Sequence, residues 1–142
     1  MEFLRLYLDY IIFSILGFMG FIVIWFSIER FLFFKKIDLK AFKSLDSLEE
    51  SLTKHMTAIY IIYSNAPYIG LLGTVGGIIV TFYGMSLGSD IDAKKIMADL
   101  SLALEATGAG LLVAIPALML YNILLRKIDL IINKYKAMHH EN

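Results

Sequence analysis

The sequence contains no cysteine and comparatively few charged residues. The lack of cysteine excludes disulfides and thiolate chemistry, although it does not identify a compartment. Charged residues make up 18% of the 142 residues and apolar residues make up 58%, so polar side chains cannot cover a water-facing surface. The formal net charge is +0, which gives no indication of a nucleic-acid partner. The charges that are present lie in blocks between long uncharged runs.

The sequence also lacks the residue sets of a soluble enzyme. It contains no nucleophile paired with a base, no phosphate-binding loop and no pair of carboxylates at catalytic spacing. Its histidines, His55, His139 and His140, have no carboxylate or thiol at ligand spacing. We therefore predict solvated histidines, no metal site, no nucleic-acid partner and no enzymatic activity.

The chain contains three long runs that are uncharged or nearly so. Residues 10–28 form the first, and at about 1.5 Å per residue they just cross a hydrocarbon core of about 30 Å. The second run covers 56–89, which is longer than one crossing requires, so we place the span at about 66–87 with the helix projecting at its N-terminal end. The third run, 100–125, contains Glu105 as its only charge. Because the backbone in lipid must satisfy its own hydrogen bonds, all three spans should be helices.

Basic residues are distributed unequally on the two sides of these spans. By the positive-inside rule, this asymmetry places the N-terminus outside and the C-terminal tail, 126–142, in the cytoplasm. No small-residue cleavage site follows the first run, so we interpret it as a retained span rather than a secretory signal. The inner side has Arg30, Lys35, Lys36, Lys40, Lys43, Lys54, Arg126, Lys127, Lys134 and Lys136, and the outer side has Arg5, Lys94 and Lys95.

The segment between the first two spans, about 30–57, is predicted to be a cytoplasmic helical hairpin. Its apolar residues recur at spacings of three or four, which is typical of a helical stripe. The turn is expected near 44–46, and a capping-box pattern at 47–50 predicts a new helix that runs into the second span. A similar pattern at 89–92 predicts the start of the third-span helix. The fold class is therefore all-α, with three transmembrane helices and long helices extending into the cytoplasm.

Small residues mark one face of the second span. Gly70, Gly77 and Gly84 are seven residues apart, and Gly73 lies four residues before Gly77. Glycines at these intervals let helix backbones approach closely. We predict that they pack the second span against other helices, within one bundle or between subunits.

Two threonines form a polar stripe on the same span. Thr74 and Thr81 are seven residues apart. They either line a polar pathway or bond back to their own backbone carbonyls, and the sequence leaves both alternatives open.

Glu105 is an ionisable residue about one and a half turns inside the third span, where a charge costs a few kcal/mol on insertion scales. Such residues normally face a bundle interior or a watery path, so we predict a role in proton or ion movement. The alternative is a structural glutamate close enough to the outer interface to reach water. Thr107 lies about 200° around the helix from Glu105, so the two cannot share one face. Pro116 should kink this helix, for packing or for gating.

Two longer motifs resemble a known family. Residues 66–78 and 106–117, the latter followed by Tyr121 and Asn122, closely resemble the second-span and third-span motifs of the MotA/TolQ/ExbB proton-channel family. Residues 28–30 after the first span also fit. The resemblance covers nearly the whole chain in order and topology, and it is strongest to compact ExbB members with a reduced cytoplasmic portion.

The resemblance implies a function that composition alone does not. ExbB-like proteins assemble as a ring, generally a pentamer, around the single-span helices of an ExbD dimer in the inner membrane of Gram-negative bacteria. Proton flow is thought to drive relative rotation, and the motion passes to TonB and to outer-membrane transporters. The implied driving ions are protons, no other cofactor is implied, and the N-terminus is expected in the periplasm.

The resemblance also assigns site residues, with one departure. Thr74 and Thr107 match the pore-associated threonines of the family, and Thr81 is a further pore-lining candidate. Family members carry an acidic residue five positions before the third-span threonine, but that position is Leu102 here. Glu105 lies three residues deeper than Leu102 and about 60° around the helix from it. Its role is therefore assigned because it is near the family position, not because it aligns with that position. The proton-accepting aspartate belongs to the ExbD-like partner.

Three other functions stay open. The chain could be a TolQ-like subunit of the Tol-Pal envelope-integrity motor, which shares the same motifs. It could be a self-sufficient ion channel, although one glutamate is a thin set of ionisable pore residues. It could also be an assembly scaffold in which Glu105 is only a hydrogen-bonding group. The flagellar MotA branch is disfavoured because the sequence has no counterpart of its large cytoplasmic region.

Overall fold

The computed structural model describes residues 2–88 and 92–140, and every regular element in them is helical. Three of these helices are long and apolar enough to cross a membrane, which confirms the predicted all-α class and the number of candidate spans. The elements, in chain order, are α1 (Glu2–Lys36), the short 3-10 helix η1 (Leu39–Ala41), α2 (Leu45–Leu52), α3 (Met56–Leu87) and α4 (Ala93–His140).

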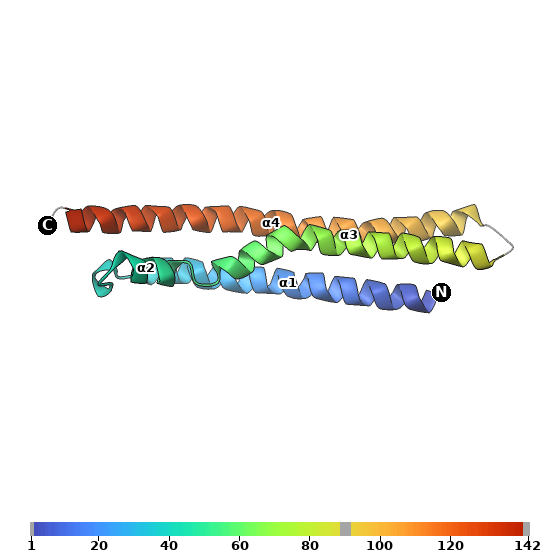
Figure 1. The fold of residues 1–142 in the computed structure, drawn as a ribbon, viewed down its shortest axis with the longest axis horizontal. Helices are drawn as coiled ribbons and strands as arrows, with labels where there is room; N and C mark the ends of the chain where they lie inside the picture. The colour runs from blue at the N-terminus through green and yellow to red at the C-terminus, as the bar shows by residue number, and fades with distance from the viewer. Residues whose placement is uncertain (1, 89–91, 141–142) are drawn as a thin grey trace.

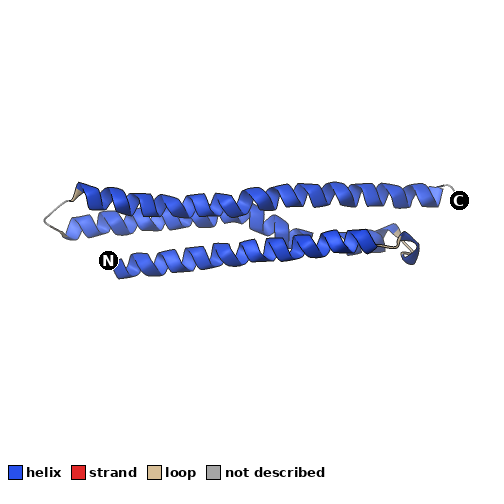
Figure 2. Ribbon diagram, turned by 180° about the vertical axis from the view of Figure 1, so that it is seen from behind, coloured by secondary structure: helices blue, strands red, loops and turns tan. Residues whose placement is uncertain are grey.

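The three long helices lie side by side in an elongated bundle (Figure 1). Helices α3 and α4 run antiparallel along most of the length of α3, and α1 packs against both of them. The N-terminus lies at the same end as the α3–α4 connection, while α2 and the C-terminus lie at the opposite end (Figures 1 and 2). The 48 residues of α4 measure about 72 Å at about 1.5 Å per residue, so this helix is much longer than a hydrocarbon core of about 30 Å.

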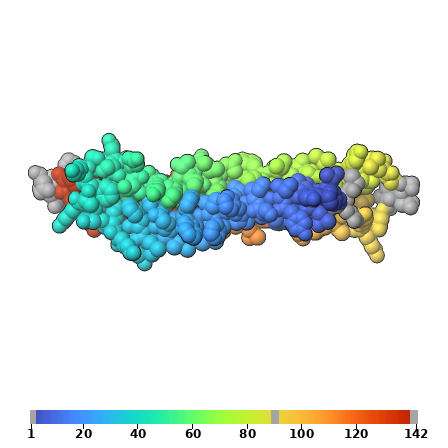
Figure 3. Space-filling view, turned by 90° about the horizontal axis from the view of Figure 1, so that it is seen from below, coloured from blue at the N-terminus to red at the C-terminus, as the bar shows by residue number. Residues whose placement is uncertain are grey.

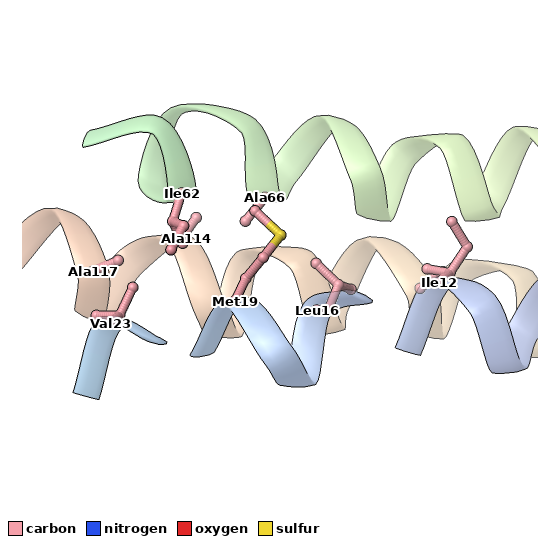
Figure 4. Close-up of a cluster of buried hydrophobic side chains, with 9 residues drawn as sticks. Ile12, Leu16, Met19, Val23, Ile62, Ala66, Ala114 and Ala117 are labelled. Atoms are coloured by element: carbon pink, nitrogen blue, oxygen red, sulfur yellow. The ribbon is translucent and has the colours of Figure 1, made fainter. Parts of the chain in front are cut away.

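The middle of the bundle is packed by large residues of α1 against small residues of α3 and α4. Figure 4 shows Ile12, Leu16 and Met19 of α1 directed toward the other two helices, where Ala66 and Ala114 leave room for them. These side chains are almost fully buried within a single chain. Alternation of large and small side chains lets the three helices interdigitate here.

A second cluster of buried apolar residues lies at the end of the bundle that holds α2. Leu48 and Leu52 of α2 are fully buried there against Ile59 of α3 and Leu124 and Ile128 of α4. The amphipathic stripe predicted between the first two spans therefore faces the long helices. Helix α2 covers the part of α4 that extends past the mid-bundle cluster.

The outer surface of the bundle is strongly apolar. Trp25 of α1, Ile79 of α3 and Leu112 of α4 are 61%, 61% and 77% exposed. In Figure 3, α1 (blue to cyan) runs along one face of the bundle with α3 (green to yellow) beside it. Large apolar side chains exposed on every long helix are expected where lipid or other subunits replace water.

The boundary of α2 differs from the predicted one. The helix begins at Leu45 rather than after Ser47, because the hydroxyl of Ser44 accepts a hydrogen bond from the main-chain N–H of Ser47 at 3.2 Å. This start gives α2 two full turns, which place both of its buried leucines on one face. Our placement of the cap at 47–50 was therefore wrong by three residues.

The sequence predicted one helix that runs from this cap into the second span, but α2 and α3 are separate helices. The chain breaks at 53–55, where His55 adopts a left-handed conformation with φ 69°. The His55 ring stacks on Phe26 with a centroid distance of 4.0 Å, so it is half-buried rather than solvated as expected. A non-glycine residue in this region ends helical propagation and gives α3 its own direction.

Two further local predictions concern the start of α4 and Pro116. Residues 89–91 of the predicted cap at 89–92 lie outside the described residues. Asp92 accepts a hydrogen bond from the main-chain N–H of Lys94 at 3.1 Å, as an N-terminal cap does. Both α3 and α4 continue as single helices through Pro67 and Pro116, and α3 bends in its first third (green in Figure 1).

Candidate functional site: the seam between α3 and α4

The main chains of α3 and α4 come into direct contact at two glycines. A Cβ atom added to Gly70 would lie 2.5 Å from the carbonyl oxygen of Ala106 and 3.1 Å from the Cα of Gly110. A Cβ added to Gly110 would lie 2.6 Å from the carbonyl oxygen of Ala66. Only glycine fits at either position, since any side chain would push the two helices apart.

Two further glycines continue this seam toward the α3–α4 connection. A Cβ on Gly73 would lie 2.7 Å from the Cβ of Ala106, and a Cβ on Gly77 would lie 2.8 Å from the Cβ of Ala103. The small residues of the second-span motif thus face the small residues of the third-span motif within one chain. Gly84, which was predicted to belong to the same stripe, is half-buried.

Thr74 lies in this seam with its hydroxyl directed at α4. The residue is 6% exposed, and its Oγ1 donates to the carbonyl oxygen of Ala103 at 2.8 Å. The hydroxyl of Thr107 makes a direct hydrogen bond with the hydroxyl of Thr74. The fold therefore brings together the two threonines that the family resemblance singled out, although they are 33 positions apart.

Thr81 is also buried, about two helical turns closer to the α3–α4 connection than Thr74. Its Oγ1 donates to the carbonyl oxygen of Gly77 at 2.8 Å, which is the backbone bond weighed as one alternative for this residue. The same oxygen accepts a longer contact of 3.4 Å from the guanidinium of Arg5. Thr81 is therefore part of a polar contact between helices as well as a back-bonded hydroxyl.

Glu105 points away from the seam. It is exposed on the surface of the chain, while Thr107 is half-buried toward α3, as the angular separation predicted. The face of α4 that carries Glu105 is mostly apolar, with Leu102 and Leu112 43% and 77% exposed on it and the exposed hydroxyl of Ser101 one turn away. Pro116 is exposed on the same helix. A carboxylate on such a face requires a polar surface opposite it, because lipid alone would leave the charge unsolvated.

A polar cluster that the sequence analysis missed joins all three long helices. Arg5 of α1 is 8% exposed and forms an ion pair with Asp99 of α4, with 2.9 Å between Nη1 and Oδ1. Its Nη2 donates to the main-chain oxygen of Asp99, and its Nη1 contacts Thr81 of α3. Among the described residues, Nε of Arg5 has no hydrogen-bond partner. One sequence signal could have predicted this ion pair. Arg5 lies just before the first span and Asp99 just before the third, so two opposite charges are expected near the outer side of the membrane.

A second buried arginine fixes α2. Arg30 of α1 is 1% exposed, and its guanidinium is paired with Glu29 at 2.6 Å. Its Nη1 also donates to the carbonyl oxygens of Ser51 and Leu52, at 2.6 Å and 3.2 Å, in the last turn of α2. The last carbonyls of a helix lack intrahelical partners and favour a cation, so this contact anchors α2 to α1.

Comparisons with known proteins agree on one family. A model of the MotA/TolQ/ExbB proton channel family matches residues 35–137. The chain is 52% identical over 138 residues to the biopolymer transport protein ExbB of Helicobacter pylori strain J99, covering 97% of this chain and 95% of that protein. It is 44% identical over 141 residues to the biopolymer transport protein ExbB of Aquifex aeolicus, covering 99% and 95%. It is 33% identical over 93 residues to the Tol-Pal system protein TolQ of Pseudomonas aeruginosa, covering 66% and 40%.

Proposed function

The chain belongs to the MotA/TolQ/ExbB proton channel family, and from this membership we propose that it is the ring-forming subunit of a proton-driven motor in the inner membrane. The family consists of proton channel and transport-motor subunits, which are not enzymes. The high identity to two proteins named ExbB over nearly their full lengths favours the ExbB branch. In this proposal the subunit works with an ExbD-like partner and TonB to energise uptake across the outer membrane.

The observation that carries this proposal is the position of Glu105. Its carboxylate lies on an exposed, mostly apolar face of α4, about 15 Å along the helix from Lys95 and about 32 Å from Arg126 at about 1.5 Å per residue. A charge this far inside a span needs a polar or watery surface opposite it. A ring of identical subunits around a central pore supplies such a surface, and a pentamer is the ring that we propose.

The threonine pair supports a polar path beside the seam. The hydroxyl of Thr107 is bonded to that of Thr74, and Thr107 is half-buried whereas Thr74 is buried, so the pair lies at the edge of the seam. We propose that Glu105, Thr107 and Thr74 contribute to the proton path, with Thr81 at its outer end. The glycines and Pro116 shape the packing of the helices that hold these groups. Protons are the driving ion, and the proposal includes no other cofactor.

The partner is expected to supply the proton-accepting group. We propose a single-span, ExbD-like protein whose membrane aspartate takes the proton inside the ring. One elementary charge that crosses the membrane releases about 2.3 kcal/mol per 100 mV, so repeated proton transfers are needed for substantial mechanical work. The basic residues support a cytoplasmic C-terminus and a periplasmic N-terminus for a multi-pass protein of the Gram-negative inner membrane.

Purification of the tagged, full-length protein from its native membrane tests the proposed assembly. Recovery of a single-span protein with a membrane aspartate, together with TonB, would support the ExbB-like function. Recovery of TolR-like and TolA-like proteins would instead favour a TolQ-like subunit of the Tol-Pal motor, the second candidate that the similarity to TolQ suggests. Repeated isolation of this chain alone would contradict both motors and favour a self-sufficient channel or a scaffold.

The Glu105→Gln variant tests the proton path. We expect it to assemble like the wild type but to lose most of the proton-dependent uptake of a TonB-dependent substrate, because the amide cannot exchange a proton. Glu50→Gln is the matched control, since Glu50 is an exposed carboxylate on α2 outside the spans. Unchanged uptake in Glu105→Gln would assign Glu105 a structural role.

A further inference from the structure

A cavity of about 240 Å³ lies between α1 and α4, beyond the predicted ends of the first and third spans. It is lined by Phe34 and Lys35 of α1 and by Lys127, Leu130 and Ile131 of α4. None of these residues belongs to the seam or to the proposed proton path. The cavity therefore combines an apolar lining with two ammonium groups from different helices.

The position of this cavity along α1 follows from the ion pair between Glu29 and Arg30, which precede Lys35. Glu29 and Arg30 neutralise each other, and Arg30 is buried, so the outward surface of α1 stays apolar past the predicted end of its span. Leu32 of α1 and Leu130 of α4 are each 51% exposed at this level. Lys35 is therefore the first exposed cation on α1, and it lines the cavity together with Lys127 of α4. Lysines just past a span extend their ammonium groups toward the lipid headgroups.

The charge at the cavity is positive. The Nζ of Lys127 lies 4.9 Å from the ring centroid of Phe31, which holds this ammonium against α1. The acidic residues nearest in sequence, Asp38 and Asp129, are not among the residues that line the cavity. An ammonium pair beside apolar side chains at the cytoplasmic boundary suits the phosphate of an anionic lipid.

A second cavity on the same pair of helices provides a place for an acyl chain. It measures about 510 Å³ and is lined by apolar residues and glycines of α1 and α4, including Ile24, Gly20 and Leu112. The near edge of this cavity, at Ile24, lies ten residues or about 15 Å along α1 from Phe34, and the cavity continues from there to Phe13. An acyl chain that spans one leaflet, about half of the roughly 30 Å core, reaches this near edge.

We propose that the groove between α1 and α4 binds an anionic phospholipid of the cytoplasmic leaflet. Lys35 and Lys127 contact the phosphate, Phe34 and Leu130 contact the glycerol region, and an acyl chain runs toward the deeper cavity. The site is independent of the motor proposal, because it uses neither the seam nor Glu105. In this proposal the lipid is a specifically bound component of the subunit, distinct from the surrounding bulk lipid.

Lipid binding to the full-length protein, purified with its membrane partners, tests this proposal directly. Native mass spectrometry would follow the fraction of protein that retains dioleoyl-phosphatidylglycerol or dioleoyl-phosphatidylcholine. We expect the wild type to retain phosphatidylglycerol preferentially, and the Lys35→Gln/Lys127→Gln variant to bind it about tenfold more weakly. Equal retention of the two lipids by the wild type would overturn the proposal.

Matched variants separate this site from general surface charge. Lys40→Gln/Lys134→Gln removes the same charge from exposed lysines that do not line the cavity, and it should bind phosphatidylglycerol like the wild type. Lys35→Arg/Lys127→Arg keeps the charge and should retain the lipid, whereas Leu130→Trp fills the cavity and should weaken binding. An equal loss in the Lys40/Lys134 control, or wild-type binding by Lys35→Gln/Lys127→Gln, would show that the groove is not the site.

Discussion

Helix α1 buries one arginine near each of its ends, and the two arginines are held by different kinds of partner. Arg5 pairs with Asp99, 94 positions away on α4, and contacts Thr81 on α3. Arg30 pairs with the adjacent Glu29 and donates to carbonyl oxygens in the last turn of α2. The polar contacts of Arg5 thus join α1 to both α3 and α4. The contacts of Arg30 are with its neighbour in sequence and with the C-terminal end of α2.

This difference shows which contacts depend on the three-helix arrangement. The ion pair of Arg5 can form only when α1 and α4 already lie together, so it reports on tertiary packing. The ion pair of Arg30 can form in an isolated α1, and only its bonds to the end of α2 require folding. Removing one partner of a buried ion pair leaves an uncompensated charge, whereas removing an exposed partner costs little.

The largest effect is expected for Arg5→Met. The substitution removes the cation opposite Asp99 and the partner of Thr81, and we expect a loss of about 3 kcal/mol in the free energy of unfolding. Unfolding of the full-length protein in detergent, induced by heat or denaturant, measures this loss. The double variant Arg5→Met/Asp99→Leu should recover part of it by removing the orphaned carboxylate. A wild-type unfolding curve for Arg5→Met would show that the three-helix cluster is not stabilising.

An intermediate and local effect is expected for Arg30→Met. Hydrogen bonds from a charged donor contribute about 1.5–3 kcal/mol, so α2 should detach more often while the seam between α3 and α4 stays closed. Hydrogen exchange of the α2 amides should accelerate, with no change in the amides of Gly70 to Gly77. Lys36→Met is the control, since Lys36 is exposed on the same helix. Faster exchange throughout the bundle would make Arg30 a global rather than a local anchor.

A smaller effect is expected for Thr81→Val, which keeps the shape of the side chain. The contact with Arg5 is long at 3.4 Å and the back-bond to Gly77 is local, so the loss should be about 1 kcal/mol or less. Thr74→Val should cost more, because that hydroxyl bonds to both Ala103 and Thr107. Unfolding measurements on the two variants give the order directly, and a larger loss for Thr81→Val would reverse our ranking.

The smallest effect is expected for Glu29→Gln. The Glu29 side chain is 37% exposed, and Arg30 keeps its hydrogen bonds to the carbonyl oxygens of Ser51 and Leu52, so the change in unfolding free energy should stay below about 1 kcal/mol. Asp99→Asn, whose original side chain is only 26% exposed, should cost more. Equal losses for the two amide variants, measured by unfolding, would remove the distinction between the two ends of α1.

The sequence was sufficient for the features that depend on local composition. Runs of apolar residues predicted the three long helices, because hydropathy and helix geometry act over neighbouring residues. Local sequence does not determine where α2 begins, since both Ser44 and Ser47 can cap a helix. The burial of Leu48 and Leu52 against α4 favours the earlier start, and that contact is not encoded locally.

The polar contacts between helices could not be read from spacing alone. Arg5 was counted only as an outer basic residue, because its pairing with Asp99 depends on the relative rotation and depth of α1 and α4. The antiparallel register of the seam places Thr81 at the level of Asp99, and this register becomes visible only once Gly70 faces Gly110. The roles of Glu105, Thr74 and Thr107 in proton movement remain proposals that the experiments above address.

The touching main chains of α3 and α4 have a mechanical consequence. At Gly70 and Gly110 no side chain separates the two backbones, so sliding one helix past the other would drive neighbouring side chains into main-chain atoms. We therefore expect α3 and α4 to move together as one rigid pair. We expect any bending of the subunit to occur where α1 packs against this pair and at 53–55, where His55 interrupts the helix.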